Sequence, residues 1–295
     1  MYIRSMEREK KLTMTLRAKK PEQIEKRLKL FLFGSPKVGK TTDVLNFPSV
    51  YHIDTEKGAV HDQYVKLMQA NGSQVFHTND VDEVIEEIRA LGTERHSFKT
   101  VAVDPVTMLE ADLVEKAEKE FGAGDMRIWG KRDRKMKRLL NLLNKLDMNV
   151  IVTAHGKIDY GPNMTRLGTT FDAWKRWPYA FDLIIELEKR GDDRVAIVRG
   201  SRLETFGEGQ TFTWSYDEFK RRYPIIDKDA EPVVLASAEQ VAELKSLLDL
   251  VKMPEGTLDK WLTAASVDVL EDMPASYIEK CIELVRKKIP TGEKK

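Results

Sequence analysis

Residues 34–41 constrain the fold of this chain more than any other segment, because they read GSPKVGKT. An apolar run at 30–33 precedes them, and residues 42–45 after them can start a helix. A strand, a loop of this pattern and a helix together form a phosphate-binding loop, whose backbone N–H groups converge on phosphate oxygens. The sequence therefore predicts a nucleoside triphosphate site, with ATP and Mg²⁺ as cofactors. Its predicted contacts are Gly34, Ser35, Pro36, Lys37, Val38, Gly39, Lys40, Thr41 and Thr42.

Three side chains define the phosphate and metal chemistry expected at this site. Lys40 is expected to place an ammonium group beside the β- and γ-phosphates and is a catalytic candidate, while the Thr41 hydroxyl is expected to ligate Mg²⁺. Asp104 ends the apolar run at 99–103. Because P-loop enzymes hold the ion with such a strand-end carboxylate, we predict Asp104 as its second protein partner.

The general base is predicted to be Glu56, which follows the apolar run at 49–53. Polar residues at the carboxyl ends of parallel strands meet at the ligand-binding edge of the sheet. Pro105 stands directly after Asp104, where an AAA-type enzyme would carry its glutamate, so we assign activation of the attacking water to Glu56. The alternative is an acidic turn at a strand end. For Asp54, a structural role and a role near the metal are equally open.

His155 follows the apolar run at 149–153. A polar side chain at that point can contact the γ-phosphate on one side and the following loop on the other, so we predict a catalytic sensor of the nucleotide state. The alternative is a structural histidine held by hydrogen bonds. A single histidine without further ligands nearby does not indicate a zinc site.

The apolar runs indicate the fold class. Four of them alternate with helical stretches, at 30–33, 49–53, 99–103 and 149–153. Continuous apolar strands separated by helices predict an α/β fold with a mostly parallel sheet covered on both faces. Two further runs, at 182–187 and 194–198, flank a polar turn with glycine and aspartate and predict an antiparallel hairpin.

We expect three segments along the chain: a basic N-terminal arm at 1–29, a core at 30–232 and a small helical module at 236–290. Ser237 and Gln240 form a capping-box pattern that opens the module. The arm is rich in lysine and arginine. It is interpreted either as solvated or as a contact with nucleic acid or a neighbouring subunit.

The chain of 295 residues carries a single cysteine, Cys281, and a net charge of +1. One cysteine excludes a disulfide framework and is typical of a reducing compartment, and the helical surroundings of Cys281 predict a buried, inert thiol. No apolar run approaches the roughly 18 residues of a membrane span. We therefore expect no membrane contact and a cytoplasmic location.

Two segments at the predicted ligand edge, 121–132 and 157–179, combine glycine, cations and aromatic rings. Cations beside stackable rings suit a sequence-tolerant site for single-stranded DNA, and long segments of this kind in a compact domain are usually functional loops. As alternatives, Trp174 and Trp177 can anchor the core, and the basic helix face at 131–137 can be merely solvated. The predicted DNA contacts are Arg127, Trp129, Lys131, Arg132, Lys157, Arg166, Lys175 and Arg176.

Over residues 30–206 these motifs resemble the core of RecA-type recombinases and, more narrowly, phage-encoded ATP-binding single-strand annealing proteins of the Sak type. The resemblance implies a RecA-like P-loop NTPase fold in which the two segments bind DNA and Glu56 is catalytic. His155 falls where many such proteins have a glutamine. Arg199 and Arg202 fall near basic residues that reach ATP across a filament interface, so they become catalytic candidates in trans. A plain surface hairpin is the alternative for both arginines.

We therefore expect an ATP-dependent single-stranded DNA-binding recombinase or annealing protein that acts in phage homologous recombination and DNA repair. It is expected to assemble with copies of itself as a filament or ring, in the host cytoplasm if phage-encoded, and to contact a single-strand-binding protein through its C-terminal module. Because only the basic arm precedes the core, annealing is favoured over full strand exchange. The alternatives are a helicase-like ATPase or loader, and a non-hydrolysing, ATP-gated DNA-binding platform. A small-molecule kinase is disfavoured, because no lid pattern is present.

Overall fold

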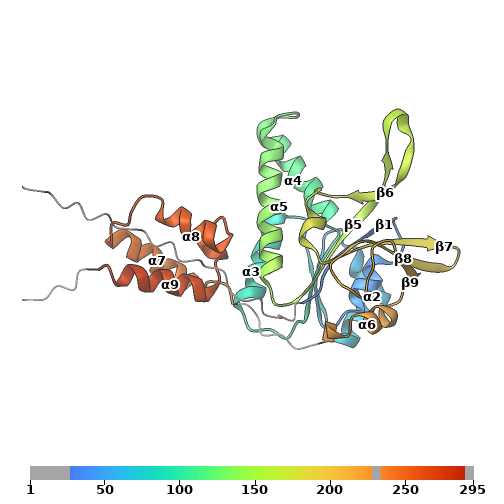
Figure 1. Cartoon of the computed structure of the whole chain (residues 1–295), viewed down its shortest axis with the longest axis horizontal. Helices are drawn as coiled ribbons and strands as arrows, with labels where there is room; N and C mark the ends of the chain where they lie inside the picture. Colours follow the sequence, from blue (N-terminus) through green and yellow to red (C-terminus); the bar gives the residue numbers. More distant parts are fainter. Residues whose placement is uncertain (1–26, 228–233, 290–295) are drawn as a thin grey trace, which may run out of the picture.

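The computed structural model describes residues 27–227 and 234–289. Within these residues nine strands form one sheet, in the order β3-β2-β4-β5-β1-β7-β8-β9, with β6 paired to β5. Figure 1 shows the sheet inside the core, with helices α7, α8 and α9 at one end of the molecule. The strands are β1 (Lys29–Gly34), β2 (Val50–Asp54), β3 (Gln74–His77), β4 (Thr100–Asp104), β5 (Asn149–Tyr160), β6 (Arg166–Asp172), β7 (Leu183–Arg190), β8 (Asp193–Ser201) and β9 (Thr211–Thr213).

The sheet confirms the predicted α/β class. Neighbours from β3 through β7 pair in parallel, and the pairs β5–β6, β7–β8 and β8–β9 are antiparallel. The apolar runs predicted as strands are β1, β2, β4 and β5, and the predicted hairpin is β7–β8 with Gly191 at positive φ in its turn. The sequence did not predict β3, β6 and β9, because these strands are short or half-exposed and contain no continuous apolar run. A mostly parallel sheet with an antiparallel hairpin is the architecture of RecA-like P-loop NTPases.

Helices cover both faces of the sheet. Alternate residues of β1 point to opposite faces: Phe31 and Phe33 pack in the hydrophobic cluster under α3, α4 and α5, and Leu30 and Leu32 pack in the cluster under α1 and α6. The helices are α1 (Lys40–Leu45), α2 (Asp62–Asn71), α3 (Val81–Thr93), α4 (Val106–Phe121), α5 (Arg127–Lys145), α6 (Tyr216–Arg222), α7 (Ala238–Leu250), α8 (Thr257–Ala265) and α9 (Ala275–Arg286).

The segment at 121–132 is not the loop that the sequence predicted. α4 ends at Phe121 and α5 already begins at Arg127, and Gly122 and Gly124, both at positive φ, make the sharp connection between them. The basic run that follows, at 131–137, consists mainly of the good helix formers lysine, arginine and methionine, which favour the helix in this segment. The predicted DNA contacts Arg127, Trp129, Lys131 and Arg132 therefore lie on a helix.

The segment at 157–179 is not one loop either. β5 leaves the sheet, runs on to Tyr160 and returns through a 3-10 turn at Pro162–Met164 into β6. Polar and apolar side chains alternate along 157–160, which is the pattern of a strand and was available in the sequence. Figure 1 shows the hairpin projecting from the core. Of the predicted contacts, the hairpin carries Lys157 and Arg166, and the segment after it carries Lys175 and Arg176.

The basic arm predicted at 1–29 falls almost entirely on residues 1–26, outside the described part. Its last residue, Lys29, is buried and begins β1. Nζ of Lys29 donates hydrogen bonds to the carbonyl oxygens of Leu143 at 3.1 Å, Leu146 at 2.9 Å and Met148 at 3.2 Å. This lysine therefore satisfies carbonyls at and after the end of α5 that lack a helical partner.

Helices α7 to α9 pack around a hydrophobic cluster of their own, which includes Leu244 and Ile278. The predicted capping box begins α7: the Ser237 hydroxyl accepts a hydrogen bond from the N–H of Gln240, and the Gln240 side chain accepts one from the N–H of Ser237. Cys281 lies in the same cluster, where burial raises the pKa of its thiol to about 11. This agrees with the inert thiol that the sequence predicts.

Asp272 ties these C-terminal helices to the core. Its buried carboxylate accepts a hydrogen bond from Nε of Arg138 at 2.8 Å and lies 3.5 Å from Nε of Arg89. Its carbonyl oxygen accepts a hydrogen bond from Nζ of Lys145 at 3.1 Å. Part of the basic face of α5 is thus engaged by acidic residues. Among the helices of the described part, none is long and apolar enough to cross a membrane.

Candidate nucleotide-binding and catalytic site

The phosphate-binding loop joins β1 to α1. Gly34 ends β1 where an added Cβ would stand only 2.3 Å from the carbonyl oxygen of Leu187, so no side chain fits there. Gly39 precedes α1 with a φ of 101°, which L side chains rarely adopt. The two glycines of the motif therefore answer two separate steric demands. α1 begins directly at Lys40, and the free backbone N–H groups of a helix start suit a phosphate.

Lys40 is held inside this loop. Its side chain is buried, and Nζ donates hydrogen bonds to the carbonyl oxygens of Gly34 at 2.9 Å and Ser35 at 3.1 Å. Burial lowers the pKa of Lys40, and the carboxylates of Asp104 and Glu56 oppose that shift. An ammonium group in a desolvated pocket attracts an anion more strongly than one in water does.

Asp104 ends β4 at the centre of a hydrogen-bond cluster. Its Oδ2 accepts a hydrogen bond from the Thr41 hydroxyl at 2.7 Å and lies 3.4 Å from Nε2 of His52, and its Oδ1 accepts one from the Thr153 hydroxyl. Burial alone would raise the pKa of Asp104, but the interactions with His52, Thr153 and Thr41 outweigh it, and the pKa is lowered. The carboxylate is therefore ionised.

The pair of Thr41 and Asp104 fits Mg²⁺. A hydroxyl and an ionised carboxylate stand side by side, and oxygen ligands of this kind suit an ion that keeps waters and phosphate oxygens in its shell. Within residues 27–227 and 234–289 no group of three or more His, Cys, Asp or Glu could hold a metal by itself. The ion would thus take its remaining ligands from the nucleotide and from water.

Glu56 and His155 meet in the cleft. Oε1 of Glu56 lies 2.8 Å from Nε2 of His155, although the strands that lead to them, β2 and β5, are separated by β4. Both side chains are partly exposed, so water can reach them. A carboxylate held by an imidazole beside a phosphate loop has the composition of a general base with an orienting partner. The roles of these two residues in catalysis stay predictions.

Asp54 has a structural role. Its Oδ1 accepts a hydrogen bond from the N–H of Glu56 at 3.1 Å, and its Oδ2 accepts one from the N–H of Ala59 at 2.8 Å. Oδ2 also lies 3.1 Å from Nδ1 of His77. Such side-chain to backbone bonds fix a turn. They set the position of Glu56, which answers the question that the sequence left open for Asp54.

Most of the predicted nucleotide-site residues share one cleft of about 510 Å³. This volume is in the range of cofactor pockets, roughly 300–1,000 Å³. Gly58, His61 and Tyr64 also line the cleft, and no sequence signal singled them out. The predicted residues in its lining are Pro36, Lys37, Gly39, Lys40, Thr41, Glu56, Asp104 and His155.

Two side chains that hold Asp104 were missed in the sequence. His52 is fully buried in β2, and Thr153 is fully buried in β5, on either side of the strand that ends in Asp104. Their contacts depend on the order β2-β4-β5, which no local pattern reveals. For Thr153 a signal was available, because a hydroxyl inside a buried apolar strand needs a hydrogen-bond partner.

Arg194 of β8 supports the phosphate loop from the other side. Its NH1 donates a hydrogen bond to Oδ1 of Asp43 at 2.6 Å, and it stands 2.6 Å from where a Cβ of Gly39 would be. Asp43 is buried in α1, and burial raises its pKa to about 6 although Arg194 opposes the shift. Oδ2 of Asp43 has no hydrogen-bond partner in the described part of the chain. Gly39 thus also leaves room for the guanidinium group.

Arg199 and Arg202 do not line the cleft of their own chain. Nε of Arg199 donates to buried Glu186 at 2.7 Å. The backbone N–H of Arg202 donates a hydrogen bond to the carbonyl oxygen of Asp182, and the backbone N–H of Asp182 donates one to the carbonyl oxygen of Lys29. Arg202 therefore stands level with the start of β1. The phosphate loop begins at the other end of that strand, about 16 Å away at the rise of a β-strand. A role for the two arginines in trans stays a prediction.

The predicted DNA contacts divide by their ionic partners. Four of them pair with acids: Arg127 with Asp125, Lys131 with Glu120, Arg132 with Asp133, and Lys157 with Asp172. Within the described residues no ion pair forms at Arg166, Lys175 or Arg176, and all three are exposed. The guanidinium groups of Arg132 and Arg176 lie over the rings of Trp129, at 4.8 Å, and Trp174, at 5.6 Å.

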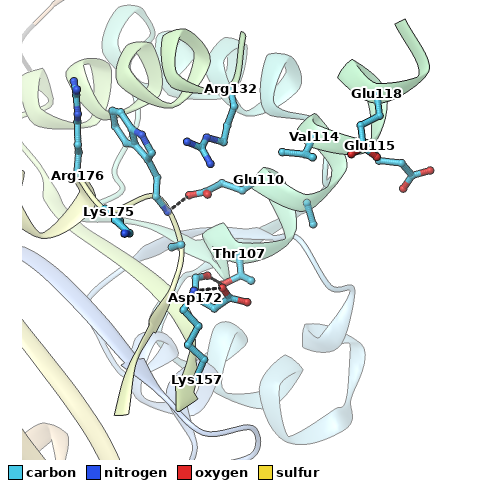
Figure 2. A pocket seen from close by; sticks show the side chains of 13 residues that line it. Thr107, Glu110, Val114, Glu115, Glu118, Arg132, Lys157, Asp172, Lys175 and Arg176 are labelled. Carbon is cyan, nitrogen blue, oxygen red and sulfur yellow. Dashed lines mark hydrogen bonds and ion pairs between the residues drawn. The ribbon is translucent and has the colours of Figure 1, made fainter. Parts of the chain in front are cut away.

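A second cavity, of about 630 Å³, lies between α4, α5 and the segment after β6 (Figure 2). Glu110 of α4 points into it, and Oε1 accepts hydrogen bonds from the backbone N–H of Trp174 at 2.5 Å and from Nε1 of Trp177 at 3.0 Å. Both tryptophans are buried in the core cluster. Of the two interpretations of these residues, the structure supports core anchors.

The fold and the cleft define a P-loop ATPase with a RecA-like core. The family described as "AAA domain" matches residues 26–213, so the chain belongs to this family. Within the matched residues Pro105 follows Asp104, and the cleft of the phosphate loop is lined by two carboxylates, Asp104 and Glu56. No curated protein matches the chain.

Two solved structures share its overall shape only loosely. The RadB recombinase is 21% identical with a TM-score of 0.42, and the match covers 64% of this chain and 88% of that one. A prototypical ATPase from the type III secretion system of pathogenic bacteria is 16% identical with a TM-score of 0.34, and the match covers 88% of this chain and 79% of that one. Likenesses of this strength carry no argument about activity, substrate or assembly.

Proposed function

We propose that this ATPase is an ATP-dependent single-stranded DNA-binding protein that anneals or recombines DNA strands. The strongest support is that a single strand, β5, connects the nucleotide cleft with the projecting hairpin. It carries His155 in the nucleotide cleft and continues to Tyr160 in the projecting β5–β6 hairpin (Figure 1). A displacement of His155 by the nucleotide would reach the hairpin through a continuous strand.

The surface around this hairpin has the chemistry that a single strand requires. Tyr160 is 50% exposed, and Arg166 is exposed on the paired strand. Lys175 and Arg176 follow the hairpin and, within the described residues, form no ion pair. Trp129 on α5 is 44% exposed and offers a second ring. Rings for base stacking beside cations for phosphates bind single strands with little sequence preference.

ATP binding and hydrolysis in the cleft would drive the cycle of DNA binding and release. Lys40 would bind the β- and γ-phosphates, Thr41 and Asp104 would hold Mg²⁺, and Glu56, oriented by His155, would activate water. ATP binding would set the hairpin for DNA, and hydrolysis would release it. The placement of these residues in one cleft supports each role, and the 2.8 Å approach of Glu56 to His155 supports the assignment of Glu56.

We propose further that the protein acts as a homo-oligomer, a filament or ring with ATP at subunit boundaries. The placement of Arg202 level with the start of β1 supports a role toward a neighbour's nucleotide, since it stands far from its own phosphate loop. A cation supplied by a second copy would make hydrolysis depend on assembly. The phage origin, the cytoplasmic location and the contact of the C-terminal helices with a single-strand-binding protein stay predictions.

Binding of a fluorescent oligo(dT) strand tests the proposed surface. The variant with Arg166, Lys175 and Arg176 all changed to Ala should bind it far more weakly than the wild type in the presence of an ATP analogue. Because each phosphate contact contributes about 0.7 to the logarithmic salt dependence for single strands, the slope should fall by about 2. The matched control, with Lys252, Lys260 and Lys280 changed to Ala, removes the same charge from exposed positions on α8, on α9 and in the connection between α7 and α8, and it should keep wild-type affinity. Equal affinity of the two triple variants would contradict the proposal.

Three further assays separate the alternatives. Directional unwinding of a forked duplex would favour a helicase-like ATPase or loader over annealing. Single-strand binding without multiple-turnover phosphate release would favour the non-hydrolysing platform. Light scattering and electron microscopy with ATP and single-stranded DNA should show an assembly, and a monomer under every condition would remove the trans role of Arg199 and Arg202.

A further inference from the structure

One face of α4 contacts both His155, which lines the nucleotide cleft, and the segment that follows the hairpin. Thr107 and Glu110 stand three residues apart, so their side chains emerge from the same side of the helix. α4 itself starts two residues after Asp104, at the end of the strand that would hold Mg²⁺. Figure 2 shows Thr107 and Glu110 pointing toward the chain segment that carries Asp172 and Lys175.

The Thr107 hydroxyl joins two strands. It accepts a hydrogen bond from the backbone N–H of His155 at 3.0 Å and donates one to the carbonyl oxygen of Asp172 at 2.7 Å. His155 and Asp172 are also opposite each other in the β5–β6 pairing, at the base of the hairpin. A single hydroxyl group therefore fixes the backbone of the residue that contacts Glu56 and the point where the hairpin ends.

Glu110 holds the next stretch of chain. Its carboxylate accepts from the N–H of Trp174 and from the indole N–H of Trp177, whose side chain is fully buried. Burial raises the pKa of Glu110, and the bonds from the two tryptophans and the charge of Arg132 oppose the shift. A buried indole N–H without a hydrogen-bond partner is unfavourable. Movement of residues 174–177 away from α4 would break these bonds at a cost in free energy, unless the Glu110 carboxylate moved with the segment.

We propose that Thr107 and Glu110 form a clamp that couples the nucleotide cleft to the single-strand surface of the hairpin. Both are positioning residues: Thr107 sets His155, and Glu110 sets the segment that presents Lys175 and Arg176. The inference rests on the proposed function, because it assigns to this clamp the regulation of single-strand affinity by the nucleotide. The clamp is separate from the phosphate contacts, since neither residue lines the nucleotide cleft.

The coupling factor of the two ligands tests the clamp. It is the ratio of the oligo(dT) dissociation constants measured with ADP and with a non-hydrolysable ATP analogue, and by reciprocity the oligonucleotide must change the analogue's affinity relative to ADP by the same factor. Coupling of this kind is typically about 5- to 150-fold. Thr107→Val, which keeps the shape and removes the hydroxyl, should bring the factor close to one, and Thr107→Ser should keep most of it.

Glu110 provides a second, independent pair of variants. Glu110→Ala removes the acceptor and should also abolish coupling, whereas Glu110→Gln keeps an amide oxygen for both N–H donors and should preserve it. Glu118→Gln lies on the same helix and lines the same cavity outside the clamp, and it should match the wild type. If circular dichroism shows that Glu110→Ala does not fold, the coupling factor of the nearly isosteric Thr107→Val variant decides whether the clamp exists.

Two different failures can be told apart. A wild-type protein that does not bind oligo(dT), or binds it equally in both nucleotide states, would overturn the proposed function and the clamp with it. A wild-type factor well above one that persists unchanged in Thr107→Val and in Glu110→Ala would overturn the clamp alone.

Discussion

Gly156 offers a test of how tightly the phosphate loop is packed against its neighbouring strand. An added Cβ at this position of β5 would stand 2.9 Å from the carbonyl carbon and 3.2 Å from Cα of Gly34, the residue that opens the loop. Both neighbours are backbone atoms, so no side chain can rotate aside. Gly156→Ala must therefore displace the loop or the strand, at a cost of roughly 1–3 kcal/mol.

Where that cost appears depends on which element moves. If the end of β1 gives way, ATP has to restore the loop when it binds, and nucleotide affinity should fall by roughly 5- to 150-fold for the same 1–3 kcal/mol. Titration of a fluorescent ADP or ATP analogue measures the affinity, and urea unfolding measures stability. We expect Gly156→Ala to lose affinity and to lose about 1–3 kcal/mol of unfolding free energy.

Gly130 supplies the matched control. It lies in α5 with nothing within 4 Å of an added Cβ, and its φ is not positive. Gly130→Ala should raise stability by about 0.5–1 kcal/mol, because alanine loses less backbone entropy in a helix, and should leave nucleotide affinity unchanged. If Gly156→Ala bound nucleotide and resisted urea as well as the wild type, the close packing of β5 on the loop would be refuted.

Three further changes test other parts of the structure. Burial raises the folded pKa of Asp43 from 3.8 to about 6, so its contribution to stability is present below pH 3.8 and is lost as the pH rises through 6. Asp43→Asn has no carboxyl group to titrate, so its free energy of unfolding should not show this loss of about 3 kcal/mol. Urea unfolding between pH 4 and 7 should show the stability of the variant rising relative to that of the wild type as the pH rises. Parallel curves of unfolding free energy against pH would contradict the prediction. Thr153→Val removes a hydrogen bond to the ionised Asp104 and should lower stability by roughly 1.5–3 kcal/mol and weaken Mg²⁺-dependent nucleotide binding, measured by Mg²⁺ titration; unchanged Mg²⁺ dependence would argue against this role. Arg138→Met removes a positive charge that stabilises the buried Asp272 carboxylate, at a cost of up to about 3 kcal/mol in unfolding free energy. Amide hydrogen exchange should therefore accelerate more in α7 and α9 than in β1. An equal acceleration in all three elements would contradict a role of Asp272 in holding the C-terminal helices to the core.

The sequence located the residues whose role is local. Lys40 and Thr41 belong to a loop whose shape follows from two glycines. Asp104 directly follows one apolar run, and Glu56 lies two residues after the strand that contains another. Because the carboxyl ends of parallel strands share one edge, their meeting in a single cleft could be anticipated. The structure adds that Asp54 fixes the turn before Glu56 by accepting its N–H.

What the sequence could not give depends on distant pairing. His52 and Thr153 reach Asp104 only because β2 and β5 flank β4. Arg194 supports the loop from a strand more than 150 residues away along the chain. The two segments expected as loops form a helix start and a β-hairpin. Glycine and charged residues favour irregular structure, whereas the alternation of polar and apolar side chains along 157–160 indicates a strand.

Phosphate release in the presence and absence of single-stranded DNA tests the central claim most directly. We predict multiple-turnover ATP hydrolysis by the wild type that oligo(dT) stimulates. Glu56→Gln should still bind the nucleotide and yet lose the stimulated rate, because the amide cannot take a proton from water. A rate that single-stranded DNA does not change, or that Glu56→Gln retains in full, would contradict the account of an ATPase whose cleft and hairpin work together.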